Sequence, residues 1–564
     1  MRQRPKTLTK NSHKRYILPV MLININNLEI SVLETDLRGA AAAKLGLKPD
    51  EIRTVQILRR SIDARQHRNV RYQYQLAVET GAPASGHGQT AGTPECLPST
   101  APRSPSSAQP VIIGAGPAGL FAALALVERG LCPVIIERGK PAAERKTDVD
   151  RFWSVGELNP ESNMYFGEGG AGTFSDGKLN TRSKNPDVTK ILQELVHCGA
   201  PPEILYDAKP HVGTDRLLEL LPRLRQRLID AGATFLFNTR LSDLRRTPGG
   251  TLEVELSTGG AGFPATCFWR PAAPLIVACG HSAFDTYRLL LRRGVPMEAK
   301  ATAIGVRMEH PAEFITRHFL GKDPKVLAVL GNAPYNLAVP VAAGTASAYS
   351  FCCCPGGEVV ACSAVNGLVS VNGMSHSRRD SPFTNAGLVT GVSPAEMLAP
   401  DAKSSGTCDA PERVREVLAW REALERRCYE LGAAAGPFAI PGQTAFDFVA
   451  GRASTRELRT SSRRPVVPTD LATALPPQIA ERLREGLRAM DQKIPGWIRF
   501  GVLLGIETTT SSPVRIVRTA QGGCEGWPEL LPVGEGSGYA GGIITSALDG
   551  YEAAQRWADA HRPT

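Results

Sequence analysis

Glycines with the spacing G-x-G-x-x-G occur three times in this chain of 564 residues. This spacing is typical of loops that bind the pyrophosphate of a dinucleotide, provided that a buried strand precedes the loop and a helix follows it. In that context the free N–H groups at the helix N-terminus meet the phosphates. The three sets are Gly114, Gly116 and Gly119 in VIIGAGPAGL; Gly167, Gly169 and Gly172 in FGEGGAGTFSDG; and Gly536, Gly538 and Gly541 in PVGEGSGYAGGI.

The first glycine loop has the full context. PVII at 110–113 is a buried strand, LFAALALVERG is an apolar helix, and PVIIER is a second strand that ends at Glu137. Gly114 permits the tight turn, Gly116 lets backbone approach the pyrophosphate, and Gly119 lets helix and sheet pack closely. Glu137 can accept hydrogen bonds from an adenosine ribose, and its charge disfavours a 2′-phosphate. The alternative, a glycine turn in some other βαβ unit, fits this context less well.

The other two loops lack parts of that context. Since the sequence ends at Thr564, we expect no second strand after the third loop, and we expect this loop to complete the first site. The middle loop is followed by TFSDGKLNTRSKNPD, which is too polar and turn-rich for the required helix. We interpret it as a polar lip over the same dinucleotide, with a plain mobile loop as the alternative.

A family resemblance rests on these loops and on further segments. A dinucleotide loop near the start of a domain and a glycine loop near its end resemble FAD-binding folds of the glutathione-reductase type. PLIVACG resembles the strand by which such folds return to the FAD domain, with Cys279 in place of the usual Thr; Gly534-Glu535 stands where Gly-Asp is usual. More specifically, the chain resembles the poorly characterised family of FAD-dependent dehydrogenases, often named NAD(P)/FAD-dependent oxidoreductases. The matching segments are RSIDAR, VIIGAGPAGLFAAL, DRFWSVGELNPESNMYFGEGGAGTFSDGKLNTR, AKPHVGTDRL, SFCCCPGGEVV, NGMSHSRRD, GIETTTSSPVRI and PVGEGSGYAGGIITSALDG.

The resemblance implies a flavoprotein with FAD as its cofactor and an unassigned small organic substrate. Glu535 would then bond hydroxyls of the ribityl chain or near the phosphates, and N–H groups near Gly541 and Gly542 would face the pyrimidine edge of the flavin. The expected cofactor-binding residues are Gly114, Gly116, Pro117, Ala118, Gly119, Glu137, Arg138, Gly169, Gly170, Gly172, Thr173, Ala278, Gly280, Gly534, Glu535, Tyr539, Gly541, Gly542 and Ile543.

The candidate catalytic residues lie in polar loops. Asp176 and Lys178, in SDGKL, are groups that could lie beside the flavin ring, with plain solvated turn residues as the alternative. His211, between Pro and Gly in KPHVGTD, is the best-placed general acid or base, and His281 is a second candidate. A histidine held by structural hydrogen bonds explains each position equally well.

A pair of charged residues precedes the last glycine loop. Glu507 and Arg515, in GIETTTSSPVRI, could pair across the flavin or the substrate. An ordinary salt bridge is the favoured alternative.

The twelve cysteines are scattered except for Cys352-Cys353-Cys354 and the nearby Cys362. No C-x-x-C pair occurs, so neither a zinc ribbon nor a thioredoxin-type centre is indicated, and no metal site is expected. Cys352 and Cys354 would point to one face of a strand, and small buried strand cysteines are favoured over a functional pair. Dispersed thiols in a long chain indicate a reducing compartment, so we expect a cytoplasmic protein.

The helices and strands that would position these residues group into several domains. We predict an α/β fold. A Rossmann-type FAD-binding domain, with three layers formed by helices, a parallel sheet and a β-meander, carries an inserted α+β substrate domain. A small α+β domain precedes them, joined by a segment of Gly, Pro, Ser and Thr that reads as a flexible linker. The expected ranges are a basic leader at 1–20, the small domain at 21–80, the linker at 81–109, the FAD-binding domain at 110–299 and 500–564, and the substrate or cap domain at 300–499.

The net charge of +10 is concentrated at the start of the sequence. Residues 1–20 carry +6, residues 21–80 carry +2, and the remainder of the chain carries +2. We expect translation to begin at Met21, which opens a strand-like run, so that the leader is not translated; an organelle transit peptide is the alternative. No apolar run approaches the roughly 18–20 residues of a membrane helix, so we expect a soluble protein without a membrane span.

Two classes of function compete. In the first, the chain is an FAD-dependent oxidoreductase, either a dehydrogenase or a reductase. No second complete Rossmann unit occurs, so NAD(P)H, if it is the reductant, would be an external donor that reaches the flavin through an open cleft. In the second, RRSIDARQHRNVR in the small domain binds RNA. The missing aromatic signature of RNA-binding sheets argues against nucleic acid as a partner, and an α+β module for protein interaction or dimerisation is the favoured alternative. The sequence leaves the oligomeric state open.

Overall fold

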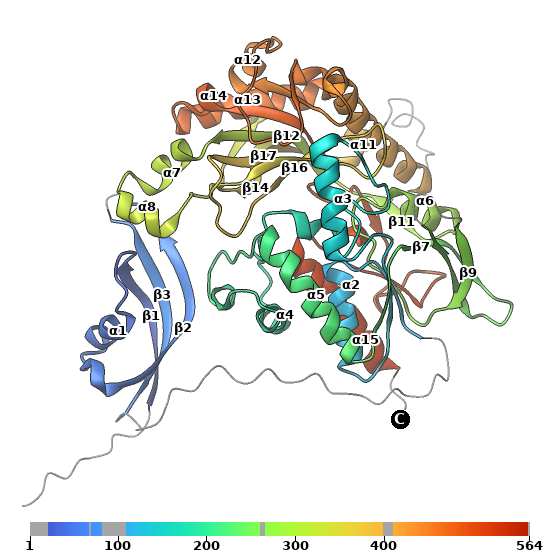
Figure 1. Cartoon of the computed structure of the whole chain (residues 1–564), viewed down its shortest axis with the longest axis horizontal. Helices are drawn as coiled ribbons and strands as arrows, with labels where there is room; N and C mark the ends of the chain where they lie inside the picture. Colours follow the sequence, from blue (N-terminus) through green and yellow to red (C-terminus); the bar gives the residue numbers. More distant parts are fainter. Residues whose placement is uncertain (1–20, 67–68, 82–108, 260–264, 399–409, 562–564) are drawn as a thin grey trace, which may run out of the picture. The chain divides into compact units, whose positions relative to one another are not determined.

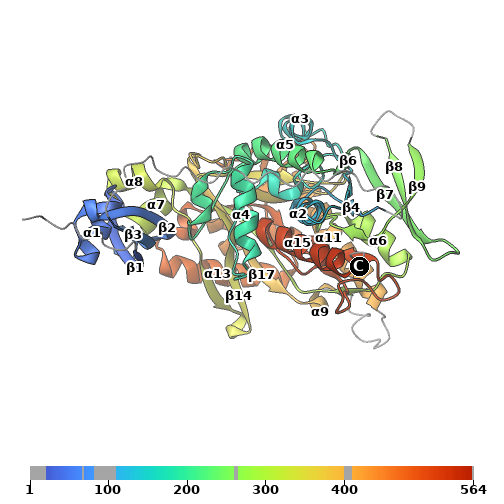
Figure 2. The same cartoon turned by 90° about the horizontal axis from the view of Figure 1, so that it is seen from below.

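The computed structural model describes residues 21–66, 69–81, 109–259, 265–398 and 410–561 (Figures 1 and 2). The chain divides into two compact units, one formed by Met1–Thr93 with Tyr206–Ala208 and the other by Pro94–Leu205 with Lys209–Thr564. The expected basic leader and nearly all of the expected linker lie outside the described residues.

The smaller unit is a three-stranded antiparallel sheet, in the order β1-β3-β2, covered by one helix. Its elements are β1 (Met21–Ser31), α1 (Leu37–Leu45), β2 (Ile52–Asp63) and β3 (Arg71–Thr80). Alternate strand residues such as Leu76 and Val78 are buried against Ala41 and Ala42 of the helix. The side chain of Asp36 begins the helix by accepting a hydrogen bond from the backbone N–H of Gly39 at 2.8 Å. The strands and the short helix that the sequence predicts over 21–80 are therefore present.

The larger unit contains a five-stranded parallel sheet in the order β22-β10-β4-β5-β6. The strands are β4 (Val111–Ile113), β5 (Val134–Ile136), β6 (Thr234–Leu236), β10 (Leu275–Val277) and β22 (Leu530–Pro532). The first glycine loop follows β4, whose neighbours β5 and β10 come from distant parts of the sequence. The order of strands changes direction at β4, and ligands of open parallel sheets bind at such a point.

Strand residues of this sheet alternate between two hydrophobic cores. Ile112 and Ile135 contribute to a core shared with helices, whereas Val111, Ile113 and Val134 contribute to a second core on the opposite face. Because side chains alternate along a strand, each continuous apolar run such as VII serves both faces. The sheet is the middle of three layers.

The helical layer consists of α2 (Pro117–Val127), α4 (Asp187–His197), α5 (Thr214–Asp230) and α15 (Ile543–Ala560). Helix α2 packs against both α5 and α15, although α15 is the last helix of the described chain (Figures 1 and 2). Gly550 makes this approach possible, since a Cβ at that position would overlap the backbone of Ala118. The packing brings the last glycine loop beside the first.

The opposite face of the sheet is covered by an antiparallel β-meander and by further helices. The meander is formed by β7 (Thr239–Arg246), β8 (Leu252–Thr258) and β9 (Thr266–Pro271). Its apolar side chains share a core with α6 (Phe284–Arg292) and with α11 (Ala410–Gly432). Helix α3 (Ala142–Val155) follows β5 and carries the buried Arg145. The parallel sheet and the meander agree with the expected fold class.

A second large sheet has seven strands in the order β13-β14-β17-β12-β20-β18-β19. Its pairings are antiparallel except that between β18 and β19. The strands are β12 (Thr302–Pro311), β13 (Ala338–Val341), β14 (Ala346–Cys354), β17 (Phe383–Val392), β18 (Ile440–Thr444), β19 (Val466–Pro468) and β20 (Val502–Glu507). Because β20 pairs with β12 and β18, this sheet extends past the expected boundary at residue 499.

Helices and two small sheets complete the larger unit. The helices are α7 (Ala312–Leu320), α8 (Pro324–Leu330), α9 (Pro394–Met397), α12 (Ala445–Ala450), α13 (Pro477–Lys493) and α14 (Trp497–Phe500). One small sheet pairs β11 (Met297–Ala299) with β21 (Val514–Ile516), and the other pairs β15 (Glu358–Cys362) with β16 (Ser370–Met374). In the described part of the chain, no helix is long and apolar enough to cross a membrane.

Candidate functional site

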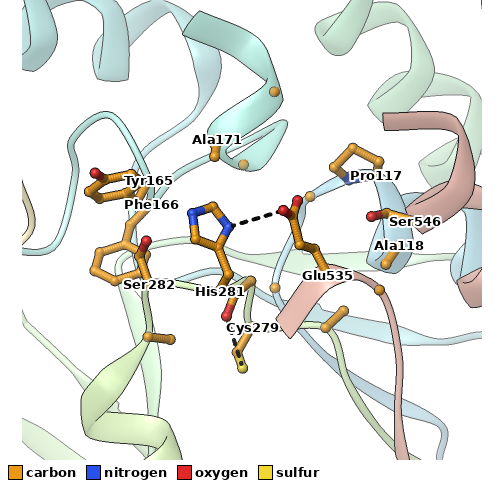
Figure 3. A pocket seen from close by; sticks show the side chains of 18 of the residues that line it. Pro117, Ala118, Tyr165, Phe166, Ala171, Cys279, His281, Ser282, Glu535 and Ser546 are labelled. Atoms are coloured by element: carbon orange, nitrogen blue, oxygen red, sulfur yellow. Dashed lines mark hydrogen bonds and ion pairs between the residues drawn. The ribbon is translucent and has the colours of Figure 1, made fainter. Parts of the chain in front are cut away.

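A cavity of about 450 Å³ lies at the carboxyl ends of β4, β5 and β10. The first glycine loop, the middle glycine loop and the last glycine loop all contribute to its wall (Figure 3). Residues of the seven-stranded sheet also reach it, among them Phe351 and Cys352. The volume is within the roughly 300–1,000 Å³ of small-molecule pockets. Three segments that are far apart in the sequence therefore form one site.

Two helix N-termini meet this cavity. Helix α2 begins after Gly116 and helix α15 after Gly542, and neither glycine has a side chain that could cap its helix. At the start of α15 the Glu535 carboxyl accepts a hydrogen bond from the Gly542 N–H, and Thr545 accepts one from the Gly541 N–H at 3.0 Å. A Cβ on Gly116 would lie 3.7 Å from the Cα of Gly170, and no described atom lies within 4 Å of the Cβ position of Gly541 or Gly542. The backbone N–H groups at the start of α2 can thus bind an anion, and there is space beside both helix ends.

The carboxylate of Glu137 joins the first two glycine loops. It is 5% exposed and accepts hydrogen bonds from the backbone N–H groups of Ala115, Gly139 and Gly167 at 2.8, 2.9 and 2.9 Å. Glu137 also lines the cavity, and each carboxylate oxygen can accept more than one hydrogen bond. Its position is compatible with the predicted bond to a ribose, which stays a prediction.

Arg145 holds the middle loop in place. This arginine is fully buried on α3, and its guanidinium donates to the carbonyls of Asn163, Met164, Glu168 and Gly170 at 2.9, 3.1, 2.7 and 2.9 Å. The loop then turns through a short 3-10 helix at Gly170–Phe174, as its polar sequence predicts in place of an α-helix. Arg145 was missed by sequence reasoning, since it is one of many charged residues of an amphipathic helix.

Most of the predicted cofactor-binding residues line the cavity. They are Gly114, Gly116, Pro117, Ala118, Glu137, Arg138, Gly170, Gly172, Ala278, Gly280, Gly534, Glu535, Gly541, Gly542 and Ile543. Gly119, Gly169, Thr173 and Tyr539 are described but are not among the lining residues. Gly119 packs α2 against the backbone of Gly114, and Tyr539 is 45% exposed with its ring against Arg515 and Arg518.

His281 and Glu535 point toward each other inside the cavity, with Nδ1 and Oε1 3.9 Å apart (Figure 3). His281 is 6% exposed, and its Nε2 atom has no hydrogen-bond partner among the described residues. Burial, together with the charge of Arg421, lowers the pKa of His281 to about 3, so the imidazole is neutral at neutral pH. Burial raises the pKa of Glu535 to about 7. Glu535 can therefore hold or release a proton beside the cavity.

The raised pKa of Glu535 predicts a pH-dependent stability in the flavin-free protein. The folded carboxyl keeps its proton up to about pH 7, whereas the unfolded one loses it near 4.5, so this contribution to stability is lost as the pH rises through that window. Glu535→Gln cannot ionise. We expect its free energy of unfolding, relative to the unsubstituted protein, to rise by about 2–3 kcal/mol between about pH 5 and pH 8.

Urea unfolding at a series of pH values measures this difference. Glu430→Gln, at an exposed position on α11, is the control and should track the unsubstituted protein at every pH. A Glu535→Gln curve parallel to that of the unsubstituted protein would show that the carboxyl ionises normally in the folded state.

A buried cluster of polar side chains forms the next part of the site. Asp176 is 1% exposed and accepts hydrogen bonds from Arg379 at 2.7 Å and from the Ser375 hydroxyl at 2.5 Å. Its Oδ2 lies 3.3 Å from Lys178 Nζ and 3.9 Å from His211 Nε2. The structure thus brings the three predicted catalytic residues together. Asp176 and Lys178 line the cavity, and His211 lies behind them.

Charges within this cluster determine its protonation. Burial raises the pKa of Asp176, but Lys178 and Arg379 lower it more, so the net pKa lies well below the ordinary value. Burial also opposes the charge of Lys178, yet the negative charges of Cys352 and then of Asp176 raise its pKa overall. Burial lowers the pKa of His211 to about 4. The cluster presents a cation from Lys178 to the cavity and keeps His211 neutral.

Glu507 and Arg515 do not pair with each other, and each forms an ordinary ion pair with another residue. Glu507 on β20 instead pairs with Arg307 on β12 at 3.0 Å, and both side chains are fully buried. Arg515 pairs with Glu298 at 2.9 Å on the small sheet formed by β11 and β21. The register of β12 against β20 places Arg307 near Glu507, and no local sequence pattern specifies that register.

Comparisons with solved structures find distant likenesses over about four-fifths of the chain. Flavin-dependent brominase Bmp2 has a TM-score of 0.34 at 11% identity, over 80% of this chain and 79% of that one. A geranylgeranyl bacteriochlorophyll reductase-like protein from Thermoplasma acidophilum has a TM-score of 0.33 at 12% identity, over 80% and 78%. OxyS anhydrotetracycline hydroxylase from Streptomyces rimosus has a TM-score of 0.33 at 13% identity, and the match covers 80% of this chain and 62% of that one. These likenesses are too distant to carry an argument about this chain.

Comparisons of sequence are more specific. Residues 22–79 match a domain of unknown function, DUF8436. Residues 301–510 match the model described as "FAD-dependent protein, C-terminal domain-like". An uncharacterized protein of Clostridium beijerinckii is 38% identical over 551 residues, which cover 95% of this chain and 98% of that protein. The chain therefore belongs to the same family as this clostridial protein, and its seven-stranded sheet lies in the part that matches an FAD-dependent protein.

Proposed function

We propose that this protein is an FAD-dependent oxidoreductase that acts on a small organic substrate. The observation that carries the proposal is that the N-termini of α2 and α15 meet at one cavity, beside the point where the sheet changes direction. N–H groups at the start of α2 suit the diphosphate of a dinucleotide, and those near Gly541 and Gly542 suit the pyrimidine edge of a flavin. The match of residues 301–510 to an FAD-dependent protein supports a flavin as the dinucleotide.

The residues present fit FAD. Gly116 leaves room for the diphosphate, and Gly541 and Gly542 leave room for the flavin ring; a side chain larger than glycine at any of them would enter that space. The carboxylates of Glu137 and Glu535 lie where ribose and ribityl hydroxyls could be bound. His281 presents a buried, unpartnered Nε2 atom to the same cavity. When bound, the flavin would supply two-electron transfer, which no protein side chain provides alone.

The chain's own residues would orient the substrate and place protons. Lys178 keeps its charge at the wall of the cavity and can stabilise negative charge on a substrate. Asp176 holds Lys178 in position, and Arg379 in turn holds Asp176. Glu535, with a pKa of about 7, can exchange a proton at neutral pH. NAD(P)H is proposed only as an external reductant that enters through the cavity.

The test is the visible spectrum of the purified protein, before and after incubation with FAD. We expect flavin absorbance bands whose intensity corresponds to about one FAD per chain. Under anaerobic conditions, NADH, NADPH or a fraction of metabolite extract should reduce the flavin and remove these bands. Free FMN and riboflavin serve as competitors, because neither has the diphosphate and the adenosine that we propose are bound by the first glycine loop and Glu137. Protein that takes up no FAD would overturn the proposal, and protein that takes up FAD but is reduced by none of these donors would overturn its redox part.

A further inference from the structure

We propose that Cys352 and Cys354 form a redox-active pair, a dithiol that becomes an intrachain disulfide by thiol–disulfide exchange at the wall of the cavity. The sequence alone favours two structural strand cysteines. The structure differs in three respects: the backbone between the cysteines, the cations beside them, and the access of one thiol to the cavity. The proposal goes beyond the proposed function and does not depend on bound flavin.

The backbone at Cys352 departs from a regular strand. Strand β14 loses its register with β17 between Phe351 and Cys354, and Cys352 has a φ of 45°. Positive φ is uncommon outside glycine and costs free energy, and such strain is concentrated at functional sites. In a regular strand, residues i and i+2 are about 6.6 Å apart, near the upper limit of the roughly 4.4–6.8 Å that a disulfide spans between Cα atoms. A bulge at this position breaks that regular spacing.

The two sulfur atoms share cations. Lys178 Nζ lies 3.6 Å from Cys352 Sγ and 3.9 Å from Cys354 Sγ. Arg307 Nη2 lies 3.2 Å from Cys354 Sγ and donates to the Cys352 carbonyl at 2.8 Å. A hydrogen bond from the Cys354 thiol and then the charges of Lys178 and Arg307 place the pKa of Cys352 well below its ordinary value. Burial raises the pKa of Cys354, which stays a thiol.

The two cysteines differ in access, and this assigns their roles. Cys352 is partly exposed and lines the cavity, whereas Cys354 is fully buried behind it. Cys352 is therefore the attacking sulfur and Cys354 the resolving one. Cys353 has a different role, because its Sγ accepts a hydrogen bond from the backbone N–H of Tyr335 at 3.4 Å and burial raises its pKa to about 11.

The reaction that we propose uses a low-molecular-weight disulfide as the oxidant. The Cys352 thiolate attacks one sulfur of that disulfide, a mixed disulfide forms, and one thiolate leaves. The leaving thiolate takes the proton of Cys354, whose sulfur attacks Cys352 Sγ and releases the second thiolate. The two cysteines lose two electrons and gain one S–S bond, while the small disulfide gains those electrons and becomes one thiol and one thiolate.

Oxidised glutathione is the probe, and the full chain is used with and without FAD. Protein reduced by dithiothreitol is desalted anaerobically, exposed to the probe, quenched with acid and alkylated, and its peptides are weighed. We expect the peptide that contains 352–354 to lose two hydrogens, with Cys353 alkylated and Cys352 and Cys354 protected from alkylation, and dithiothreitol to reverse the change. We expect Cys354→Ser to accumulate glutathione on Cys352, and Cys352→Ser to accumulate none on this peptide.

Cys267 provides the control, since it is an exposed thiol on β9 away from the cavity. Cys267→Ser should leave the disulfide unchanged. In the native protein at neutral pH, iodoacetamide should modify Cys352 about fivefold faster than Cys267. The larger fraction of thiolate at Cys352 outweighs the lower nucleophilicity of that thiolate. Lys178→Met should reduce the rate at Cys352 to that at Cys267.

Two results would overturn the proposal. One is full alkylation of both Cys352 and Cys354 in the unsubstituted protein after exposure to the probe, which requires no variant to fold. The other is the absence of a mixed disulfide in a folded Cys354→Ser protein. Both are read by mass in flavin-free protein, so failure of the dithiol and failure of FAD binding are distinguishable.

Discussion

Gly116→Leu is expected to abolish FAD uptake while the protein stays folded. Gly116 has a φ of −79° and a ψ of −178°, an extended conformation that any residue adopts. Its Cβ would lie 3.7 Å from the nearest described atom, which is ordinary van der Waals contact. The leucine side chain must then extend into the space in front of helix α2, where we place the diphosphate. Because the diphosphate could then no longer approach the backbone at Gly116, FAD binding should weaken by at least about 100-fold, or about 2.7 kcal/mol.

Flavin absorbance per chain after incubation with FAD measures the effect, and the thermal midpoint reports the fold. Gly391→Leu is the matched control, because no described atom lies within 4 Å of its Cβ position and Gly391 does not line the cavity. It should bind FAD normally. Normal FAD content in Gly116→Leu would contradict the assignment of the first glycine loop as the diphosphate site.

Arg145→Met is expected to destabilise the protein by about 4 kcal/mol, a large effect for one substitution. The guanidinium satisfies carbonyl groups of Asn163, Met164, Glu168 and Gly170 in a region where water does not replace it. Methionine fills much of the same volume but donates no hydrogen bond. Each buried acceptor left without a donor costs about 1–3 kcal/mol, and relaxation of the loop recovers part of the sum.

Denaturant unfolding measures this loss, and Arg151→Met on the same helix is the control. The Arg151 side chain is 65% exposed and pairs with Glu157, so its replacement should change stability by no more than about 0.5 kcal/mol. Because Arg145 fixes the loop that carries Gly170, Arg145→Met should also weaken FAD binding. Equal unfolding midpoints for the two variants would show that the loop is held by other contacts.

Local sequence predicts the elements of this site well where neighbouring residues decide the structure. The run VII, the glycines that follow and the apolar helix specify β4, the turn and α2, because strand burial, tight turning and helix packing depend on adjacent residues. The polar segment after Gly172 excludes a long helix for the same reason. Glu137 is predictable too, since it ends the strand that follows α2.

The contacts that local sequence does not specify involve partners far apart in the sequence. Glu507 pairs with Arg307 rather than with Arg515, because strand register selects among many available cations. Tyr539 packs against arginines instead of lining the cavity, although it lies between glycines that do line it. Arg145 has no local signal, since its acceptors come from a loop that only the tertiary fold brings to α3.

The sequence by itself determined the strand–turn–helix around Gly114–Gly119, the polar character of the middle loop and the candidacy of Asp176, Lys178 and His211. Only the tertiary structure decided that these three side chains meet, and that Lys178 lies between two cysteines on β14. The physical reason is that turns and helix starts depend on a few adjacent residues. The environment of a buried charge depends on which distant strands pair and in which register.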